Sequence, residues 1–327
     1  MAATEDATTV WFHRNFLRLT GGHLKHAHYF DHVRRLPGYV PRISFTAEPG
    51  ASHHPDQRRL WPPRKGAYAE RWRPSRPDIF FLAGLDWRYL IDNGLDASPN
   101  PRINLIQHVR HAHEDTELHS YLKQRAVRIC VSEEVAQALL ATGEVNGPVF
   151  TIANGMRTPP AIALHRFAAD LLPRRRRSVI VVGYKRPELA NALSERLTDA
   201  KVPHQLLLDF LPREQFLAAL AGAEVTVCLP NAEEGFYLPA LEAMACGSVV
   251  VTLDCIGNRS FCHNLENCLV APEDPDTLTA ATIHALALYP KARKALRRRA
   301  DETVHQHSLA KERQRFHEIL GNIHSIW

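Results

Sequence analysis

Short apolar segments that resemble β-strands alternate with segments of helical periodicity along most of this chain, and the series occurs twice. The first series begins with TTVWFHRNF at residue 8 and reaches VRICVS at residue 127, and the second begins with SVIVVG at residue 178. Strands that are apolar throughout are typical of parallel sheets covered by helices on both faces. The pattern therefore predicts two α/β layers, each around a buried parallel sheet.

The apolar runs and their periods place the elements. In the first half we expect strands at 8–16, 43–47, 78–84, 103–108 and 127–132, and helices at 23–36, 117–125 and 133–140. In the second half we expect strands at 178–183, 205–210, 224–230 and 248–254, and helices at 187–197, 212–223 and 239–247, followed by terminal helices. The segment 53–77 is rich in Pro and Arg without a sustained period, which predicts a long surface loop.

A length of 327 residues favours two domains, since one hydrophobic core seldom organises so long a chain. The α/β pattern stops in the segment RTPPAIALHRFAADLLPRRRR, which follows Met156, and restarts near Ser178. We therefore expect an N-terminal domain over 1–156, a C-terminal domain over 157–305 and a C-terminal helix over 306–327. A tail of that length can reach back to the first domain.

Composition limits the class of protein more than its function. Apolar residues make up 45% of the chain and charged residues 23%, as in ordinary globular proteins. The first thirty residues carry charges throughout and no long apolar run follows, and the six cysteines contain no C-x-x-C pair, so we expect a cytoplasmic protein with reduced thiols. The formal net charge of +5 suits anionic ligands such as nucleotides or phospholipid headgroups.

The string NAEEGFYLPALEAMACGSVVV is the most informative segment. It joins the end of an expected strand to a helix with Pro239 near its first position and Gly247 as its stop. In a doubly wound sheet, ligands lie beyond the carboxyl ends of the strands, where this places Glu234. Glu242 is expected in the first helical turn, where a carboxylate can accept hydrogen bonds from ribose hydroxyls while free N–H groups favour a phosphate. The alternative is that Glu234 only complements the charge of the helix N-terminus and that Glu242 faces solvent.

This string resembles the E-x7-E donor signature of glycosyltransferase family 4, whose members are retaining enzymes of the GT-B fold. The likeness extends from about Gly21 to Asp276 and implies two Rossmann-like doubly wound domains facing a central cleft. It assigns Glu234 to the transferred sugar and Glu242 to the ribose. It also assigns backbone contacts with phosphate or sugar to Gly235, Phe236, Tyr237 and Leu238.

Two further segments occupy places where the family binds the donor diphosphate. VVGYKRPELANAL offers Lys185 and Arg186 where the family carries basic residues, and a cation there would stabilise the charge that develops on the leaving diphosphate. The spacing does not choose between them, and a solvated turn is the alternative. Near the start, LTGG places Gly21 and Gly22 where the family has a glycine-rich loop, and an ordinary tight turn is the alternative.

His108 is at the end of an expected strand, where family members place a histidine against the donor sugar. His108, His111 and His113 do not have the spacing of a usual zinc site, so no metal and no cofactor is expected. The resemblance thus implies a metal-independent, retaining transfer of a sugar from a nucleotide diphosphate-sugar to a saccharide, lipid-linked or small-molecule acceptor.

Two other classes of function fit parts of the sequence. The run Arg174–Arg177 and the arginines around 58–76 would suit nucleic acid or the inner face of an anionic membrane, although no nucleic-acid motif accompanies them. A peripheral membrane contact would bring the enzyme to a lipid-linked acceptor. A sugar-nucleotide epimerase on the same scaffold is a further alternative, because a fold does not fix a function.

Overall fold

The chain divides into two compact units, each with one parallel sheet. The computed structural model describes residues 7–16, 20–46, 55–62, 67–157 and 178–327. The N-terminal unit comprises Met1–Asn154 together with Leu309–Trp327, and the C-terminal unit comprises Gly155–Ser308. The expected pair of layered parallel sheets is confirmed.

The sheet of the N-terminal unit has six parallel strands in the order β2-β1-β3-β4-β5-β6. The strands are β1 Thr8–Arg14, β2 Tyr39–Phe45, β3 Ile79–Ala83, β4 Arg102–Ile106, β5 Val127–Cys130 and β6 Val149–Thr151. Because all strands are parallel, their carboxyl ends lie along one edge. His108 and the segment after β1 therefore belong to the same edge of this sheet.

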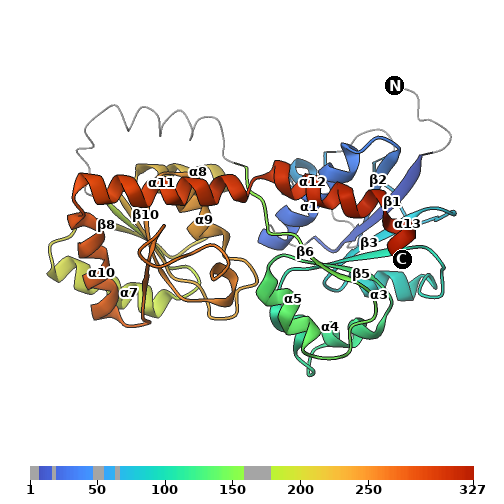
Figure 1. The fold of residues 1–327 in the computed structure, drawn as a ribbon, viewed down its shortest axis with the longest axis horizontal. Helices are drawn as coiled ribbons and strands as arrows, with labels where there is room; N and C mark the ends of the chain where they lie inside the picture. Colours follow the sequence, from blue (N-terminus) through green and yellow to red (C-terminus); the bar gives the residue numbers. More distant parts are fainter. Residues whose placement is uncertain (1–6, 17–19, 47–54, 63–66, 158–177) are drawn as a thin grey trace. The chain divides into compact units, whose positions relative to one another are not determined.

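Helices cover both faces of this sheet. They are α1 Gly21–Arg34, α2 Pro55–Leu60, α3 Asp86–Asp92, α4 Glu117–Ser120, α5 Glu133–Leu140, α12 Leu309–Gly321, α13 Ile323–Ile326 and the short helices η1 Val109–Ala112 and η2 Tyr121–Lys123. Figure 1 shows α1 and α12 on one face and α4 and α5 on the other. Aromatic rings fill the first of these interfaces: Phe12 stacks on Phe81 at 4.6 Å, and Tyr29 meets Phe316 of α12 edge-on at 4.8 Å.

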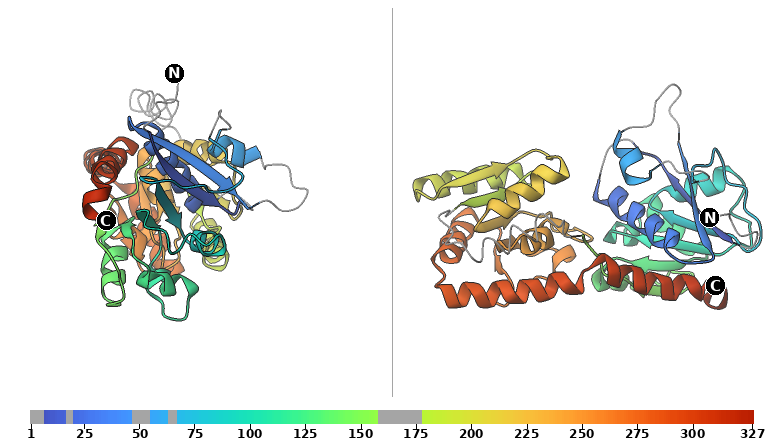
Figure 2. Two further views of the ribbon diagram at one scale, coloured as in Figure 1. Left: turned by 90° about the vertical axis from the view of Figure 1, so that its right-hand side faces the viewer. Right: turned by 90° about the horizontal axis from the view of Figure 1, so that it is seen from above.

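The C-terminal unit has a five-stranded parallel sheet in the order β11-β10-β9-β7-β8. Its elements are β7 Val179–Val182, α7 Pro187–Asp199, β8 His204–Leu207, α8 Arg213–Gly222, β9 Val225–Cys228, α9 Leu238–Ala245, β10 Val249–Leu253, η3 Ile256–Asn258, β11 Leu269–Ala271, α10 Pro275–Ala287 and α11 Pro290–Gln306. Helices α8, α9 and α11 pack on one face and α7 and α10 on the other, as Figures 1 and 2 show. The second half thus follows the predicted alternation, except that β11 was not predicted.

Three local predictions were wrong. The segment 53–77 is not loop throughout, because α2 lies within it. The helix expected over 117–125 is divided into α4 and η2, since the buried guanidinium of Arg128 takes the carbonyls of Tyr121 and Leu122 at 2.9 and 3.0 Å. Gly21 and Gly22 do not form a turn before a helix but begin α1, whose cap is Thr20.

The end of the chain packs within the N-terminal unit through α12. Lys25 and His32 on α1 form ion pairs with Glu312 on α12, and all three side chains are buried. The run Arg174–Arg177 lies outside the described residues. Among the helices that the structure does describe, none is long and apolar enough to cross a membrane.

Candidate functional site

The acidic loop between β9 and α9 lies at the carboxyl end of β9 and is anchored by its backbone to the turn after β10. The N–H of Ile256 donates to the carbonyl of Ala232 at 2.9 Å, and the N–H of Tyr237 donates to the carbonyl of Gly257 at 2.8 Å. Glu234 lies between these two anchors, and its carboxylate accepts from the N–H of Asn231 at 3.4 Å. The loop is therefore held at both ends, with the Glu234 side chain part-exposed between them.

Gly257 has no room for a side chain. A Cβ there would lie 2.6 Å from the carbonyl oxygen of Glu234 and 2.8 Å from the amide nitrogen of Phe236, and both are backbone atoms. Sequence reasoning missed this residue, because nothing near Gly257 in the chain points to a loop some twenty residues earlier.

The substitution Gly257→Ala should therefore displace the acidic loop and destabilise the C-terminal unit by about 1–3 kcal/mol, the usual cost of overpacking. Calorimetric unfolding measures this. Gly222→Ala is the matched control, since a Cβ at Gly222 meets no atom within 4 Å. Equal stability of the two variants would contradict the role given to Gly257.

Lys185 and Glu234 come together across two loops. Lys185 Nζ lies 2.5 Å from Glu234 Oε1 and 5.4 Å from the centre of the Tyr237 ring. The turn that carries Lys185 begins at Gly183, where a Cβ would lie 2.3 Å from that of Ala190, so α7 can start close to the strand. The Tyr237 hydroxyl is buried and has no hydrogen-bond partner among the residues described, which leaves a polar group for a ligand or water to satisfy.

Glu242 is buried in α9, not exposed to solvent, and forms an ion pair with Arg213 at the start of α8. Burial raises the pKa of its carboxyl group, and the charge of Arg213 opposes that rise. The expectation that Glu242 lies in the first helical turn was wrong, because α9 begins at Leu238 and reaches Glu242 in its second turn. Arg213 was not predicted from the sequence, since it lies far upstream of Glu242.

An aromatic pair lies beside these charges. The rings of Tyr184 and Phe210 are 4.3 Å apart, and Phe210 is 74% exposed. Both residues follow strand ends, β7 and β8, at the same edge as Glu234. Burial raises the pKa of the Tyr184 hydroxyl, and the nearby carboxylates of Glu242 and Glu234 raise it further.

The two basic residues of the β7–α7 turn point to different partners. Arg186 pairs with Glu273, which follows β11, and its Nη1 lies 3.1 Å from Glu273 Oε2. Lys185 alone of the two contacts Glu234. Of the other predicted loop residues, Gly235 is buried, Phe236 stacks on Phe261 at 4.9 Å, and Leu238 begins α9.

In the N-terminal unit, the predicted Gly21, Gly22 and His108 lie at the carboxyl edge of the sheet. Gln107 Nε2 is 3.5 Å from the carbonyl oxygen of Gly22, so the start of α1 adjoins the end of β4. The ring of His108 caps η1, its Nδ1 accepting from the N–H of Arg110 at 3.1 Å. A Cβ on Gly21 would meet no atom within 4 Å, so sterics do not require glycine there.

A buried charged cluster at this edge was not predicted. Arg14, at the end of β1, donates to the carbonyl of Ala83 at 3.1 Å and approaches Asp86 at 3.3 Å. Burial raises the pKa of Asp86 to about 6, although Arg14 and the Ala83 N–H lower it. Burial lowers the pKa of the neighbouring His13 to about 4, and Arg14 adds to that effect. Within the described ranges, no three His, Cys, Asp or Glu side chains gather as metal ligands.

The architecture matches solved structures along nearly the whole chain. Anabaena Alr3699/HepE, solved in complex with UDP-glucose, has a TM-score of 0.70 and 12% identity, covering 96% of this chain and 99% of that one. A UDP-forming α,α-trehalose-phosphate synthase from Burkholderia vietnamiensis has a TM-score of 0.59 and 16% identity, covering 77% and 74%. Two parallel α/β sheets in this arrangement define the fold as GT-B-like.

The sequence comparisons match mainly the second half of the chain. Residues 148–287 match the family model described as Glycosyl transferases group 1. The MMP alpha-(1->4)-mannosyltransferase of Mycolicibacterium hassiacum is 38% identical over 110 residues, which cover 31% of this chain and only 25% of that protein. The matched residues 148–287 include both Glu234 and Glu242. The resemblance to family 4 and the expected GT-B fold are confirmed.

Proposed function

We propose that this protein is a retaining glycosyltransferase that moves a sugar from a nucleotide diphosphate-sugar to an acceptor hydroxyl. The contact of Lys185 with Glu234 at the carboxyl end of β9 carries the proposal. It joins a cation that can face a diphosphate to a carboxylate that can face a sugar, at the edge where doubly wound sheets bind ligands. The match of residues 148–287 to the group 1 glycosyltransferase model supports it.

The donor would lie across the carboxyl edge of the C-terminal sheet. Glu242 would accept hydrogen bonds from ribose hydroxyls, taking over part of the contact that Arg213 makes with it. The exposed ring of Phe210, packed on Tyr184, offers a flat apolar face for a nucleobase. The backbone of the acidic loop and the unpaired Tyr237 hydroxyl would contact phosphate or sugar.

Charge stabilisation would be the main chemical contribution of these residues. As the sugar leaves, negative charge grows on the diphosphate, and the Lys185 ammonium group would stabilise it. Glu234 would position the sugar and stabilise the positive charge that develops on it. The departing diphosphate would take the acceptor proton, so the transfer would need no protein base and no metal. In the N-terminal unit, His108 and the start of α1 would serve the acceptor or the sugar.

A panel of UDP-, GDP-, dTDP- and ADP-sugars, titrated calorimetrically in EDTA, tests the proposal and identifies the donor. One nucleotide class should bind and undergo transfer. We expect Lys185→Gln to lower the transfer rate by about 10²- to 10³-fold, the usual loss when a group that stabilises developing charge is removed. The matched control Arg186→Gln should change the rate less than about threefold, because it breaks only an exposed pair.

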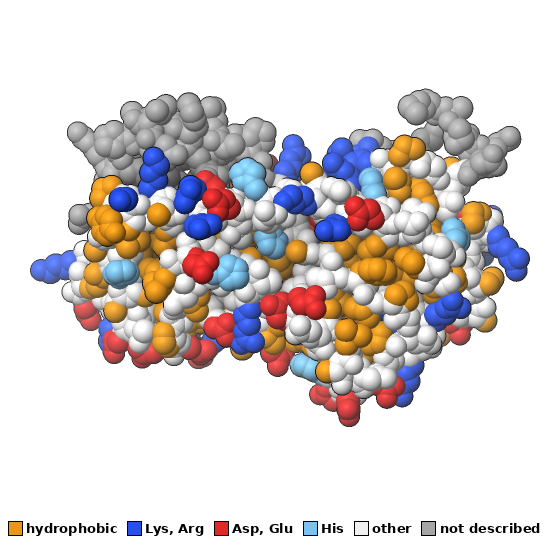
Figure 3. Space-filling view, in the orientation of Figure 1, with side chains coloured by type: hydrophobic (Ala, Val, Ile, Leu, Met, Phe, Trp, Pro, Cys, Tyr) orange, Lys and Arg blue, Asp and Glu red, His pale blue; other side chains and the backbone are white. Residues whose placement is uncertain are grey.

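Failure of every nucleotide-sugar to bind would refute the donor site. A larger loss in Arg186→Gln than in Lys185→Gln would refute the assignment of the diphosphate to Lys185. The nucleic-acid alternative gains no support from the face of the molecule shown in Figure 3. In the face shown in Figure 3, basic side chains are interspersed with acidic ones and do not form a continuous positive stripe.

A further inference from the structure

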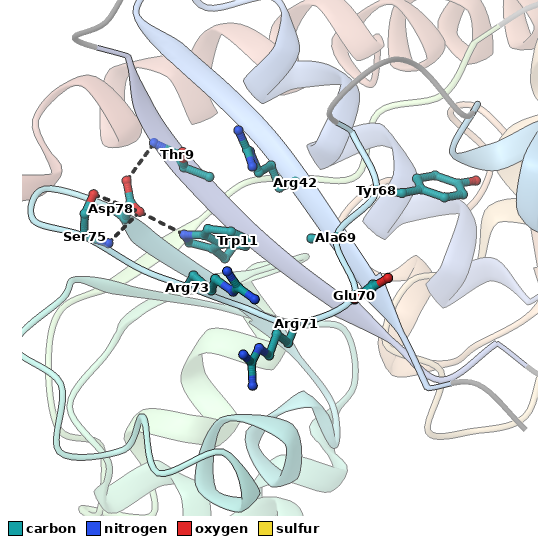
Figure 4. A pocket seen from close by; sticks show the side chains of 10 residues that line it. All are labelled: Thr9, Trp11, Arg42, Tyr68, Ala69, Glu70, Arg71, Arg73, Ser75 and Asp78. Carbon is teal, nitrogen blue, oxygen red and sulfur yellow. Dashed lines mark hydrogen bonds between the residues drawn. The ribbon is translucent and has the colours of Figure 1, made fainter.

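A pocket lies in the N-terminal unit, on the sheet face opposite α1. Its volume is about 430 Å³, and it is lined by β1, β2 and the segment from Tyr68 to Asp78. Phe12 of β1 packs against His26 and Phe30 of α1. Because side chains alternate along a strand, Thr9 and Trp11 point to the other face, where they form the floor of the pocket (Figure 4).

Three arginines line the pocket. Arg42 comes from β2. Arg71 and Arg73 come from the segment that extends from Tyr68 to Asp78, which we call the crossing segment. The guanidinium carbon of Arg42 lies 5.8 Å from the centre of the Trp11 ring. None of the three has an ion-pair partner within the described part of the chain. An anion in the pocket would supply the counter-charge that these arginines lack.

The acidic groups of the pocket do not supply that counter-charge. Asp78 is buried and accepts from the N–H of Thr9 at 3.0 Å, from Trp11 Nε1 at 3.0 Å and from the N–H of Ser75 at 2.9 Å. Its carboxylate is thus committed to holding the floor and the crossing segment together. Glu70 forms no ion pair with the arginines, and in Figure 4 it points to the opposite side from Arg71.

The pocket is separate from the edge proposed for glycosyl transfer. Thr9 lies at the start of β1 and Asp78 immediately precedes β3, so the pocket extends to the amino ends of the strands. Arg14, Asp86 and His108 lie at the carboxyl ends. A ligand in the pocket would therefore not be the acceptor of that reaction.

We propose that this pocket is a binding site for a phosphate group, held by Arg42, Arg71 and Arg73 over Trp11. Guanidinium groups suit phosphate because they present several N–H donors in one plane. This site would give a function to Arg71 and Arg73, which the proposed donor site does not use. The phosphate would belong to a soluble phosphate ester or to a phospholipid headgroup, and the two sources are separable by experiment.

Inorganic phosphate is the first probe. All five tryptophans lie in the N-terminal unit, so their fluorescence reports unfolding of that unit alone. At about ten times its dissociation constant, phosphate should raise the midpoint of thermal unfolding by about 3 °C over chloride at equal ionic strength. The double variant Arg71→Gln and Arg73→Gln should lose this shift while keeping its midpoint in chloride, because both side chains are exposed.

Arg315→Gln is the matched control, since it removes the same charge from an exposed position on α12 and should keep the shift. Flotation with vesicles of phosphatidylcholine, with or without phosphatidic acid, separates the two sources. Binding to acidic vesicles that the double variant loses would assign the site to a lipid headgroup, and a phosphate shift without vesicle binding would assign it to a soluble ester. Equal midpoints in phosphate and chloride, or an equal shift in the double variant, would overturn the proposal.

Discussion

Replacement of Glu312 by alanine should lower the free energy of unfolding of the N-terminal unit by about 3–5 kcal/mol, the usual cost of removing one partner of a buried ion pair. Its carboxylate has no exposed surface and pairs with Lys25, which is 1% exposed, and with His32. Alanine would deprive the buried Lys25 ammonium of the Glu312 carboxylate. Because Glu312 lies on α12 and Lys25 on α1, the loss would also loosen the C-terminal helix.

The same three residues, Glu312, Lys25 and His32, should make the stability of the N-terminal unit depend on pH. Burial alone would raise the pKa of Glu312, but Lys25 and His32 outweigh it and hold that pKa at about 2, against an ordinary 4.5. A lowered folded-state pKa contributes stability above the unfolded value and loses it as the pH falls through the folded value. The wild-type N-terminal unit should therefore lose this contribution between pH 4.5 and about 2, and the alanine variant should show no such component.

Urea unfolding followed by tryptophan fluorescence measures both effects, since all five tryptophans belong to this unit. Glu318→Ala on the same helix is the control, because Glu318 is 51% exposed in a loose pair with Arg315 and should cost less than about 1 kcal/mol. Adding Lys25→Met to Glu312→Gln should restore much of the stability by removing the buried charge that has lost the Glu312 carboxylate. If Glu312→Ala and Glu318→Ala were equally stable, the cluster would have no such role.

The parts of the fold that the sequence predicts depend on local pattern. The order of strands and helices follows from apolar runs, and Ser132, a residue type that favours the N-cap position, caps α5 by accepting from the N–H of Val135 at 3.3 Å. Gly247 ends α9 at a φ of +75°, a conformation that glycine adopts without strain. The strand β11 was missed because it has only three residues and its pairing with β10 is invisible in the sequence.

The residues of the candidate site were likewise predicted only where a local sequence pattern identifies them. Glu234 and Glu242 were found because they share one loop and helix, whereas Arg213 and Gly257 reach them only through tertiary packing. Lys185 and Arg186 are neighbours with nearly the same chemistry, so no local pattern could separate them. The partners that distinguish the two cations, Glu234 and Glu273, come from different strand ends.

Loss of Arg213 should weaken nucleotide binding more at low pH than at high pH. Ribose hydroxyls donate to a carboxylate best when it is ionised, and burial already raises the pKa of Glu242 while Arg213 opposes that rise. Arg213→Gln should therefore move the protonation of Glu242 to higher pH. For stability, a carboxyl group whose folded-state pKa is raised contributes below its unfolded value and loses that contribution as pH rises through the folded value. Without nucleotide, the C-terminal unit of this variant should become less stable toward neutral pH.

Titration calorimetry of the preferred nucleoside diphosphate between pH 5 and 8 separates a charge effect from a structural one. We expect Arg213→Gln to lose about tenfold in affinity at the acidic end, equivalent to about 1.4 kcal/mol, and less at pH 8. Glu242→Gln should bind weakly with little of this pH dependence, because its amide does not titrate. Arg196→Gln, which breaks an exposed pair with Asp276 in the same unit, should follow the wild-type curve. A loss in Arg213→Gln that is the same at every pH would mean that Arg213 holds the nucleotide directly and does not act by keeping Glu242 ionised.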